Sequence, residues 1–107
     1  MYVRMSRWDS RPGMDGESLR LWSTGAREIF FNQRGIVAAS LLALPDSDTR
    51  MTFSVWETAA DHDRFVAGDL RRAVQMYDGV FAPGSAPNPT LWQVLSDDWG
   101  RPPVDPF

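Results

Sequence analysis

The chain has no cysteine and no lysine, and it has one histidine, His62. Without cysteine there is no thiol nucleophile, disulfide, iron–sulfur cluster or thiolate zinc site. Without lysine there is no Schiff base, no attachment point for pyridoxal phosphate and no phosphate-binding lysine of a P-loop. One histidine is too few for a two-histidine iron site or a zinc HExxH motif within one chain. We therefore expect no metal and no cofactor.

Basic patches and long apolar runs are also missing. All eleven basic residues are arginine, they are dispersed, and the formal net charge is −3, which argues against nucleic acid as a partner. The N-terminal segment carries Arg4 and Arg7 where a signal peptide needs an apolar run. No stretch has the length and hydropathy of a transmembrane helix. The sequence thus predicts no membrane partner and, by default, a cytoplasmic location.

The length of 107 residues suits one domain that buries roughly two thirds of its chain surface. We place this domain at residues 1–97. The remaining residues 98–107 are rich in proline and contain little that is typical of a helix or strand, so we expect an irregular tail.

Residues 51–77 contain the clearest structural signals. Met51, Phe53 and Val55 alternate with smaller or polar residues, which predicts a strand that ends at Glu57. Thr58 and Asp61 then have the spacing of a capping box, which predicts a helix from about Ala59. Apolar residues continue in a broad arc to Tyr77 and Phe81, and Gly68 with Asp69 is expected to break or re-phase that helix.

Three further strands and one helix complete the pattern. Alternation predicts a strand over residues 2–8, a continuous apolar run predicts one over 35–44, and residues 90–95 predict a short last strand. A helix is expected between them, with Asp15 as its N-cap and an end at Gly35. Its apolar stripe comprises Leu19, Trp22, Ala26, Ile29 and Phe30.

The resulting order βαββαβ predicts an α+β, ferredoxin-like fold, in which both helices cover one face of a four-stranded antiparallel sheet. The middle strands are apolar on both sides, so the other face would expose a large hydrophobic surface in a monomer. Pairing of two sheets about a twofold axis would cover it. We therefore expect a homodimer.

The run FSVWETAADHDRF at residues 53–65 resembles the antibiotic biosynthesis monooxygenase (ABM) family of dimeric α+β barrels. Members of that family commonly carry a hydrophobic strand that ends in Trp-Glu-Ser or a similar triplet. Through the order of its elements the resemblance covers residues 2–95. It implies the same ferredoxin-like subunit and the same homodimeric barrel.

A pocket is expected between the helices and the sheet, and His62 and Tyr77 are the candidate catalytic residues. On a continuous helix His62 and Tyr77 would both face inward. For His62 we favour the alternative of a solvated first-turn side chain between Asp61 and Asp63, and for Tyr77 we favour core packing with the hydroxyl able to reach the pocket. If the first strand is placed as in the family, it contributes Arg4 and Ser6, and pairing of Arg4 with a carboxylate is the alternative for that residue. The other candidate substrate-binding residues are apolar: Trp22, Trp56, Phe65 and Val66. For at least two of the three aromatic residues among them, core packing is the alternative.

The resemblance implies a monooxygenase that oxidises a small aromatic or polyketide-like metabolite without metal, flavin or haem. Such a reaction needs an apolar chamber, a base and a hydrogen-bond donor to a phenolate, for which the aromatic residues, His62, and Tyr77 or Arg4 are candidates. Two alternatives remain: a non-catalytic ligand-binding or stress-related dimer, and a haem-binding protein. A haem-degrading branch of the family uses an Asn, a Trp and a His where this chain has Ser6, Phe65 and Gln75, which argues against haem.

Overall fold

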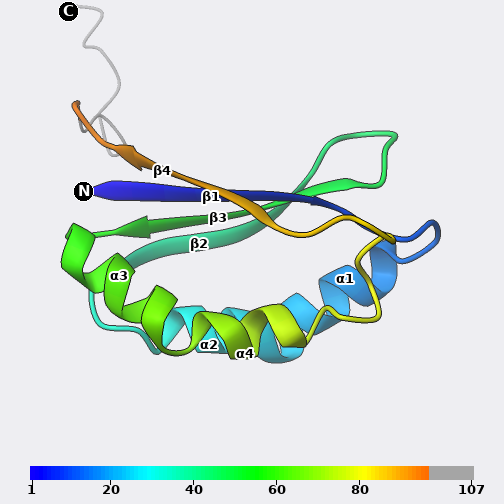
Figure 1. Cartoon of the computed structure of the whole chain (residues 1–107), viewed down its shortest axis with the longest axis horizontal. Helices are drawn as coiled ribbons and strands as arrows, with labels where there is room; N and C mark the ends of the chain where they lie inside the picture. Colours follow the sequence, from blue (N-terminus) through cyan, green and yellow to red (C-terminus); the bar gives the residue numbers. More distant parts are fainter. Residues whose placement is uncertain (97–107) are drawn as a thin grey trace, which may run out of the picture.

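A computed structural model describes residues 1–96 and contains one four-stranded antiparallel sheet. Its strands β1 (Tyr2–Asp9), β2 (Ile36–Ala43), β3 (Thr49–Trp56) and β4 (Asn88–Gln93) lie in the order β2-β3-β1-β4. The helices lie together on one face of the sheet (Figure 1). The predicted ferredoxin-like α+β fold is confirmed, whereas the predicted tail at residues 98–107 lies outside the described residues.

The first helical segment is interrupted, contrary to the prediction of one continuous helix. It consists of α1 (Asp15–Leu21), the π-helical segment η1 (Trp22–Ala26) and α2 (Arg27–Phe31). A π-helical turn holds more residues than an α-helical turn, so it rotates the preceding residues relative to those that follow. Trp22 is therefore buried, whereas Leu19, which was expected on the same stripe, is 59% exposed.

Asp15 is not the N-cap of the first helix, as we had predicted. Met14 occupies that position without a side-chain cap, and Asp15 is the first helical residue. The Asp15 carboxylate instead accepts a hydrogen bond from the buried guanidinium of Arg50 on β3. Tertiary pairing with a buried cation outweighs local capping here, and it ties the start of α1 to the sheet.

The second helical segment begins and breaks as predicted. The Thr58 hydroxyl accepts a hydrogen bond from the Asp61 amide at 3.1 Å, and α3 (Ala59–Ala67) starts directly after it. The pKa of the Asp61 carboxyl is lowered, mainly by its hydrogen bond with the Thr58 hydroxyl and next by its hydrogen bond with Arg64. Gly68 ends α3, and α4 (Leu70–Gln75) follows with a new direction. The break lets α4 present a different set of side chains to the sheet.

The last strand begins two residues earlier than predicted, because β4 lies at the edge of the sheet and, among the described strands, pairs with β1 alone. Pro89 has no N–H to give to a ladder, which is tolerated where one side of the strand faces no neighbour. Pairing thus extends back to Asn88 opposite Arg7, and Leu95, predicted to be in the strand, is 90% exposed.

The core lies between the sheet and the helices. Trp56 at the end of β3 and Phe65 on α3 have 0% exposure, and their rings are stacked with centroids 5.0 Å apart. Phe30 on α2 packs on Phe65 from the other side, with centroids 4.8 Å apart. These three rings join both helical segments to the sheet.

Within the described part of the chain, residues 1–96, no helix lies on the opposite face of the sheet (Figure 1). The register aligns Met5, Phe53 and Ser40 across β1, β3 and β2, so side chains in step with these face away from the helices. At its margins Leu42 on β2 is 46% exposed and Trp92 on β4 is 58% exposed. We call this surface the open face; it is the apolar surface that the sequence predicted.

Within residues 1–96, no helix combines the length and the hydropathy that crossing a lipid bilayer would require.

Candidate active site

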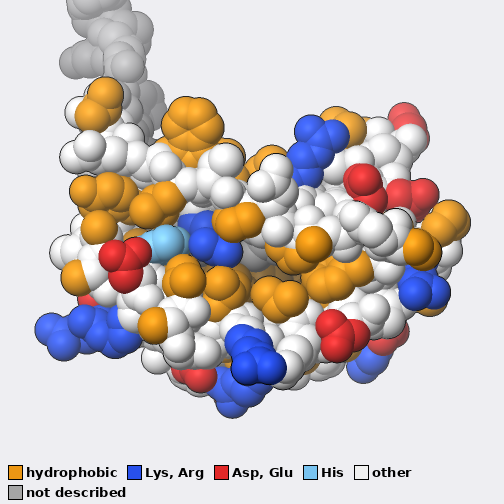
Figure 2. All heavy atoms as spheres, in the orientation of Figure 1, with side chains coloured by type: hydrophobic (Ala, Val, Ile, Leu, Met, Phe, Trp, Pro, Cys, Tyr) orange, Lys and Arg blue, Asp and Glu red, His pale blue; other side chains and the backbone are white. Residues whose placement is uncertain are grey.

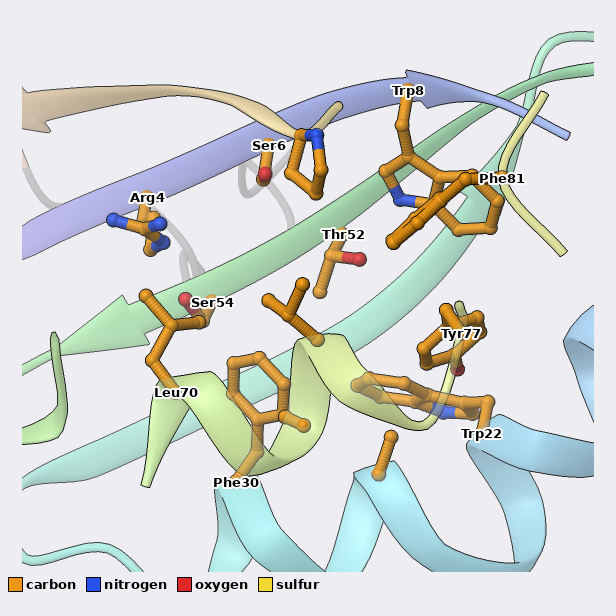
Figure 3. A pocket seen from close by; sticks show the side chains of 14 residues that line it. Arg4, Ser6, Trp8, Trp22, Phe30, Thr52, Ser54, Leu70, Tyr77 and Phe81 are labelled. Carbon is orange, nitrogen blue, oxygen red and sulfur yellow. The ribbon is translucent and has the colours of Figure 1, made fainter. Parts of the chain in front are cut away.

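A pocket lies between the helix-facing side of the sheet and the helices (Figure 3). Its interior has a volume of about 40 Å³, and about 480 Å³ of unfilled space is present when the open mouth is included. In Figure 2 hydrophobic side chains gather along the gap between β4 and α4, and the single histidine lies beside a basic side chain toward α3. The lining residues are Arg4, Ser6, Trp8, Trp22, Ala26, Phe30, Thr52, Ser54, Leu70, Ala73, Val74, Tyr77, Phe81 and Pro87.

One end of the pocket is polar. Arg4 on β1 and Ser54 on β3 are direct partners in the sheet register, and Ser6 lies two residues along β1 on the same face. Ser54 is buried, and its hydroxyl accepts a hydrogen bond from the Trp56 indole N–H at 3.0 Å. These three side chains come together because a strand repeats its face every second residue.

Arg4 is connected to His62 and through it to Asp63. An Arg4 guanidinium nitrogen lies 3.3 Å from His62 Nε2, and His62 Nδ1 lies 3.0 Å from Asp63 Oδ1. His62 is 6% exposed, so the prediction of a solvated imidazole is wrong. The ring sits behind Arg4 and against Trp56, with ring centroids 6.2 Å apart, and is not one of the lining side chains.

The other end of the pocket is aromatic (Figure 3). The rings of Trp8, Tyr77 and Phe81 pack on one another with centroid separations of 5.2 to 6.1 Å. The Tyr77 hydroxyl is buried without a hydrogen-bond partner among the described residues, and burial raises the pKa of this phenol. Tyr77 therefore stays protonated at neutral pH, which makes it a hydrogen-bond donor and not a base.

Four of the eight predicted site residues line this pocket: Arg4, Ser6, Trp22 and Tyr77. His62 reaches it only through Arg4. Trp56 and Phe65 are fully buried in the core, in agreement with the alternative of core packing for two of the three aromatic candidates. Val66 on α3 is 41% exposed. The structure does not bring these last three into the pocket, and the catalytic roles of His62 and Tyr77 stay predictions.

Several lining residues were not predicted from the sequence. Trp8 continues the alternation of Arg4 and Ser6, and Phe30 lies eight residues after Trp22 on the helical stripe, so periodicity alone pointed to both. Predicting Thr52 and Ser54 as lining residues would have required knowing that β3 pairs with β1. Predicting Leu70 and Val74 would have required knowing how α4 is oriented after the break at Gly68, and no local pattern in the sequence specifies that orientation.

The interior of about 40 Å³ has room for water, because one water molecule needs about 10–15 Å³. Pockets that enclose a drug-sized molecule are typically about 300–1,000 Å³. A ring compound therefore fits only if the wall widens toward the mouth. Leu70 and Val74 are half-buried lining side chains of α4, which follows the break at Gly68.

No protein-family model and no curated protein matches the chain. Solved structures match it in fold. SnoaB, a cofactor-independent oxygenase from Streptomyces nogalater, has a TM-score of 0.72 at 17% identity, covering 90% of this chain and 94% of SnoaB. The NE2512 protein of unknown function from Nitrosomonas europaea has a TM-score of 0.74 at 18% identity, covering 90% of each chain.

A protein from Deinococcus radiodurans that is provisionally named an antibiotic biosynthesis monooxygenase has a TM-score of 0.70 at 9% identity, covering 91% of this chain and 95% of that one. At such identities these similarities establish a common fold. The fold implied by the resemblance of residues 53–65 is thereby confirmed.

Proposed function

We propose that the protein is a cofactor-independent monooxygenase that acts on a small aromatic or polyketide-like metabolite. The observation that carries the proposal is the pocket, which is an apolar chamber with Arg4 at one end and Tyr77 among aromatic rings at the other. The fold shared with SnoaB, a cofactor-independent oxygenase, supports it.

The proposed reaction needs dioxygen and a substrate with an acidic carbon next to a phenol or ketone. A base removes a proton from that carbon, and the carbanion supplies the electrons that reduce dioxygen and form a carbon-bound hydroperoxide. Loss of water then leaves a carbonyl, so that one oxygen atom enters the substrate and the other leaves as water. The protein's task is to exclude water, to remove the proton and to stabilise the oxyanion.

The residues near the pocket divide these tasks. Arg4 stabilises the oxyanion, and the protonated Tyr77 hydroxyl donates a hydrogen bond. Among residues 1–96 no carboxylate or imidazole lines the pocket, and the imidazole of His62 contacts the lining residue Arg4. Its Nε2 is engaged by Arg4, so proton transfer to His62 requires Arg4 to turn toward the substrate's oxygen.

Oxygen uptake with anthrone as substrate tests this function. We expect the His62→Ala, Tyr77→Phe double variant to lose at least about 100-fold in rate, which is the scale of losing one oxyanion donor. The Tyr77→Phe substitution removes a hydroxyl that has no hydrogen-bond partner among residues 1–96, and it should leave stability unchanged or slightly improved. Tyr2→Phe is the matched control, because Tyr2 does not line the pocket. A double variant as fast as the wild type would contradict the assignment.

The alternative is a non-catalytic dimer of the same fold that binds a small ligand. The lack of a carboxylate or imidazole among the lining residues favours it. It predicts ligand binding without any uptake of oxygen above the rate of the uncatalysed reaction. Oxygen uptake by the wild type that depends on Tyr77 would contradict this alternative.

We further propose that a second copy of the chain covers the open face. Leu42 and Trp92 place large apolar area in water at the margins of this face, next to the half-buried Phe53 and Met5. Two sheets that pack face to face would bury all four side chains. The dimer would use the open face, so the pocket of each chain would lie on the other side of its sheet, beneath that chain's own helices.

A further inference from the structure

We propose that the pocket selects an aromatic anion, that Arg4 binds its negative charge, and that His62 and Asp63 hold Arg4 in position for this. The chemical class is a carboxylate or phenolate carried by a ring system. The inference rests on the proposed function in taking this pocket as the substrate site, and it goes further in naming the charge of the substrate and the residue that recognises it.

Arg4 differs from the other arginines that are held by side chains. It is half-buried and its contact is with an imidazole, and no carboxylate among residues 1–96 lies within ion-pair distance of it. Burial lowers the pKa of its guanidinium. A cation withdrawn from water without an anion is costly, and an anionic ligand removes that cost. The arginines that do pair with carboxylates are Arg20, Arg50, Arg64 and Arg72.

Among residues 1–96, the lining side chains next to Arg4 add hydrogen-bond donors and no negative charge. The Ser54 oxygen already accepts the Trp56 indole N–H, so its own proton is available to a ligand. Ser6 lies on the same face of the sheet and makes no side-chain hydrogen bond within residues 1–96. This end of the pocket therefore offers a cation and two hydroxyl protons, which match the oxygens of a carboxylate or phenolate.

The contact between Arg4 and His62 determines the tautomer of the imidazole. A guanidinium donates hydrogen bonds and cannot accept them, so His62 Nε2 must accept and carries no proton. The proton is then on Nδ1 and is donated to the Asp63 carboxylate at 3.0 Å. The neutral ring orients Arg4 without neutralising it. An acid in the place of His62 would cancel the charge that an anion needs.

The rest of the pocket favours a ring as the body of the ligand. Trp22 and Phe30 line it from the first helical segment, with centroids 5.5 Å apart, and Tyr77 lines it near Trp8. Figure 3 places the rings of Trp8, Trp22 and Tyr77 away from Arg4, so a flat apolar body and a charged group would occupy different parts of the pocket. The arrangement suits a compound with its charge at one edge.

Calorimetric titration with a matched pair of probes, 2-naphthoate and 2-naphthamide, tests the inference at pH 7.5. The two differ in charge and are close in shape. We expect the wild type to bind the carboxylate about 10- to 100-fold more tightly than the amide, the scale of a hydrogen bond to a charged group. The Arg4→Met variant, which removes an unbalanced cation and keeps the apolar stem, should fold and bind both probes equally weakly.

Arg7→Met is the matched control, because Arg7 lies on the same strand, is exposed and faces away from the pocket. This variant should keep the preference for the carboxylate. Equal affinities of the wild type for the two probes, no binding of 2-naphthoate at millimolar concentration, or a preference that survives in Arg4→Met would each overturn the inference. Charge-dependent binding without oxygen uptake would support the anion site and contradict the monooxygenase function. Oxygen uptake with charge-independent binding would support the monooxygenase function and contradict the anion site.

The positioning role of His62 is tested separately by the tautomer of its imidazole. The chain contains one histidine, so the ¹⁵N signals of an imidazole belong to His62 without further assignment. In ¹⁵N spectra we expect the wild type to show the Nδ1-protonated tautomer, and Asp63→Asn to lose that preference together with part of the preference for 2-naphthoate. Asp78→Asn, a change of charge elsewhere on the surface, should alter neither. An Nε2-protonated ring in the wild type would contradict the positioning role.

Discussion

The Trp56→Ala variant is expected to lose about 3–5 kcal/mol of unfolding free energy, the range for a large aromatic side chain deleted from a core. Trp56 has 0% exposure, stacks on Phe65 and donates its indole N–H to Ser54. Its removal leaves a cavity and a buried hydroxyl without its donor. Domains of this size have about 5–15 kcal/mol in total, so this one substitution would remove a large share of the stability.

Urea denaturation followed by circular dichroism measures this loss. Phe31→Ala is the matched control: Phe31 is an aromatic residue that is 44% exposed and rests near Arg27, so its loss should cost at most about 1 kcal/mol. Trp56→Phe should fall between the two, because it keeps most of the stacked ring and loses the indole N–H. A Trp56→Ala variant that is as stable as wild type but binds ligand differently would place Trp56 in the pocket instead of the core.

The Leu42→Asp variant is expected to dissociate the proposed dimer. Leu42 is 46% exposed in the single chain, so a carboxylate there should disturb the monomer little. In a dimer of face-to-face sheets the same carboxylate would be buried without a partner in both copies, at a cost of about 3–5 kcal/mol each. Sedimentation velocity at micromolar concentration should find the wild type at twice the chain mass of 12.1 kDa and the variant at 12.1 kDa.

Leu19→Asp is the control for this prediction, because Leu19 is 59% exposed on α1, on the helical side of the sheet. It carries the same change of charge and should sediment like the wild type. A wild type that sediments as a single chain would remove the dimer, and with it our explanation of the apolar open face. Loss of the dimer in Leu19→Asp would move the interface to the helices.

The fold was predictable where local signals and the hydrophobic pattern agree. Thr58 with Asp61 marked the start of α3, Gly68 marked its end, and alternation along residues 2–8 placed Arg4 and Ser6 on one face. The failures arise where tertiary contacts outweigh local preference. Asp15 pairs with Arg50 instead of capping its helix, and the π-helical segment turns Leu19 outward.

The candidate site was predictable only in part. Helical periodicity placed His62 on the inner side of α3, but it gave no indication that Arg4 would lie between the imidazole and the pocket. Such contacts depend on the lengths of two side chains from distant elements. For the same reason Trp56 and Phe65, whose aromatic character suggested a binding wall, proved to be stacked on each other in the core.

The site explains why His62 and Tyr77 require different tests. Tyr77 is a lining donor with a raised pKa, so its contribution is a hydrogen bond and should show little dependence on pH near neutrality. His62 contacts Arg4, and its removal should weaken recognition of charge as well as any proton transfer. Comparing affinity and rate in the two single variants separates these contributions.

A crystal structure of the protein with 2-naphthoate would show whether the pocket between sheet and helices binds an aromatic anion at Arg4, as we propose. We expect the carboxylate within hydrogen-bond distance of the Arg4 guanidinium and the rings among Trp22, Phe30 and Tyr77, with Leu70 displaced outward. A ligand on the open face, or one in the pocket with its carboxylate turned away from Arg4, would contradict the proposal.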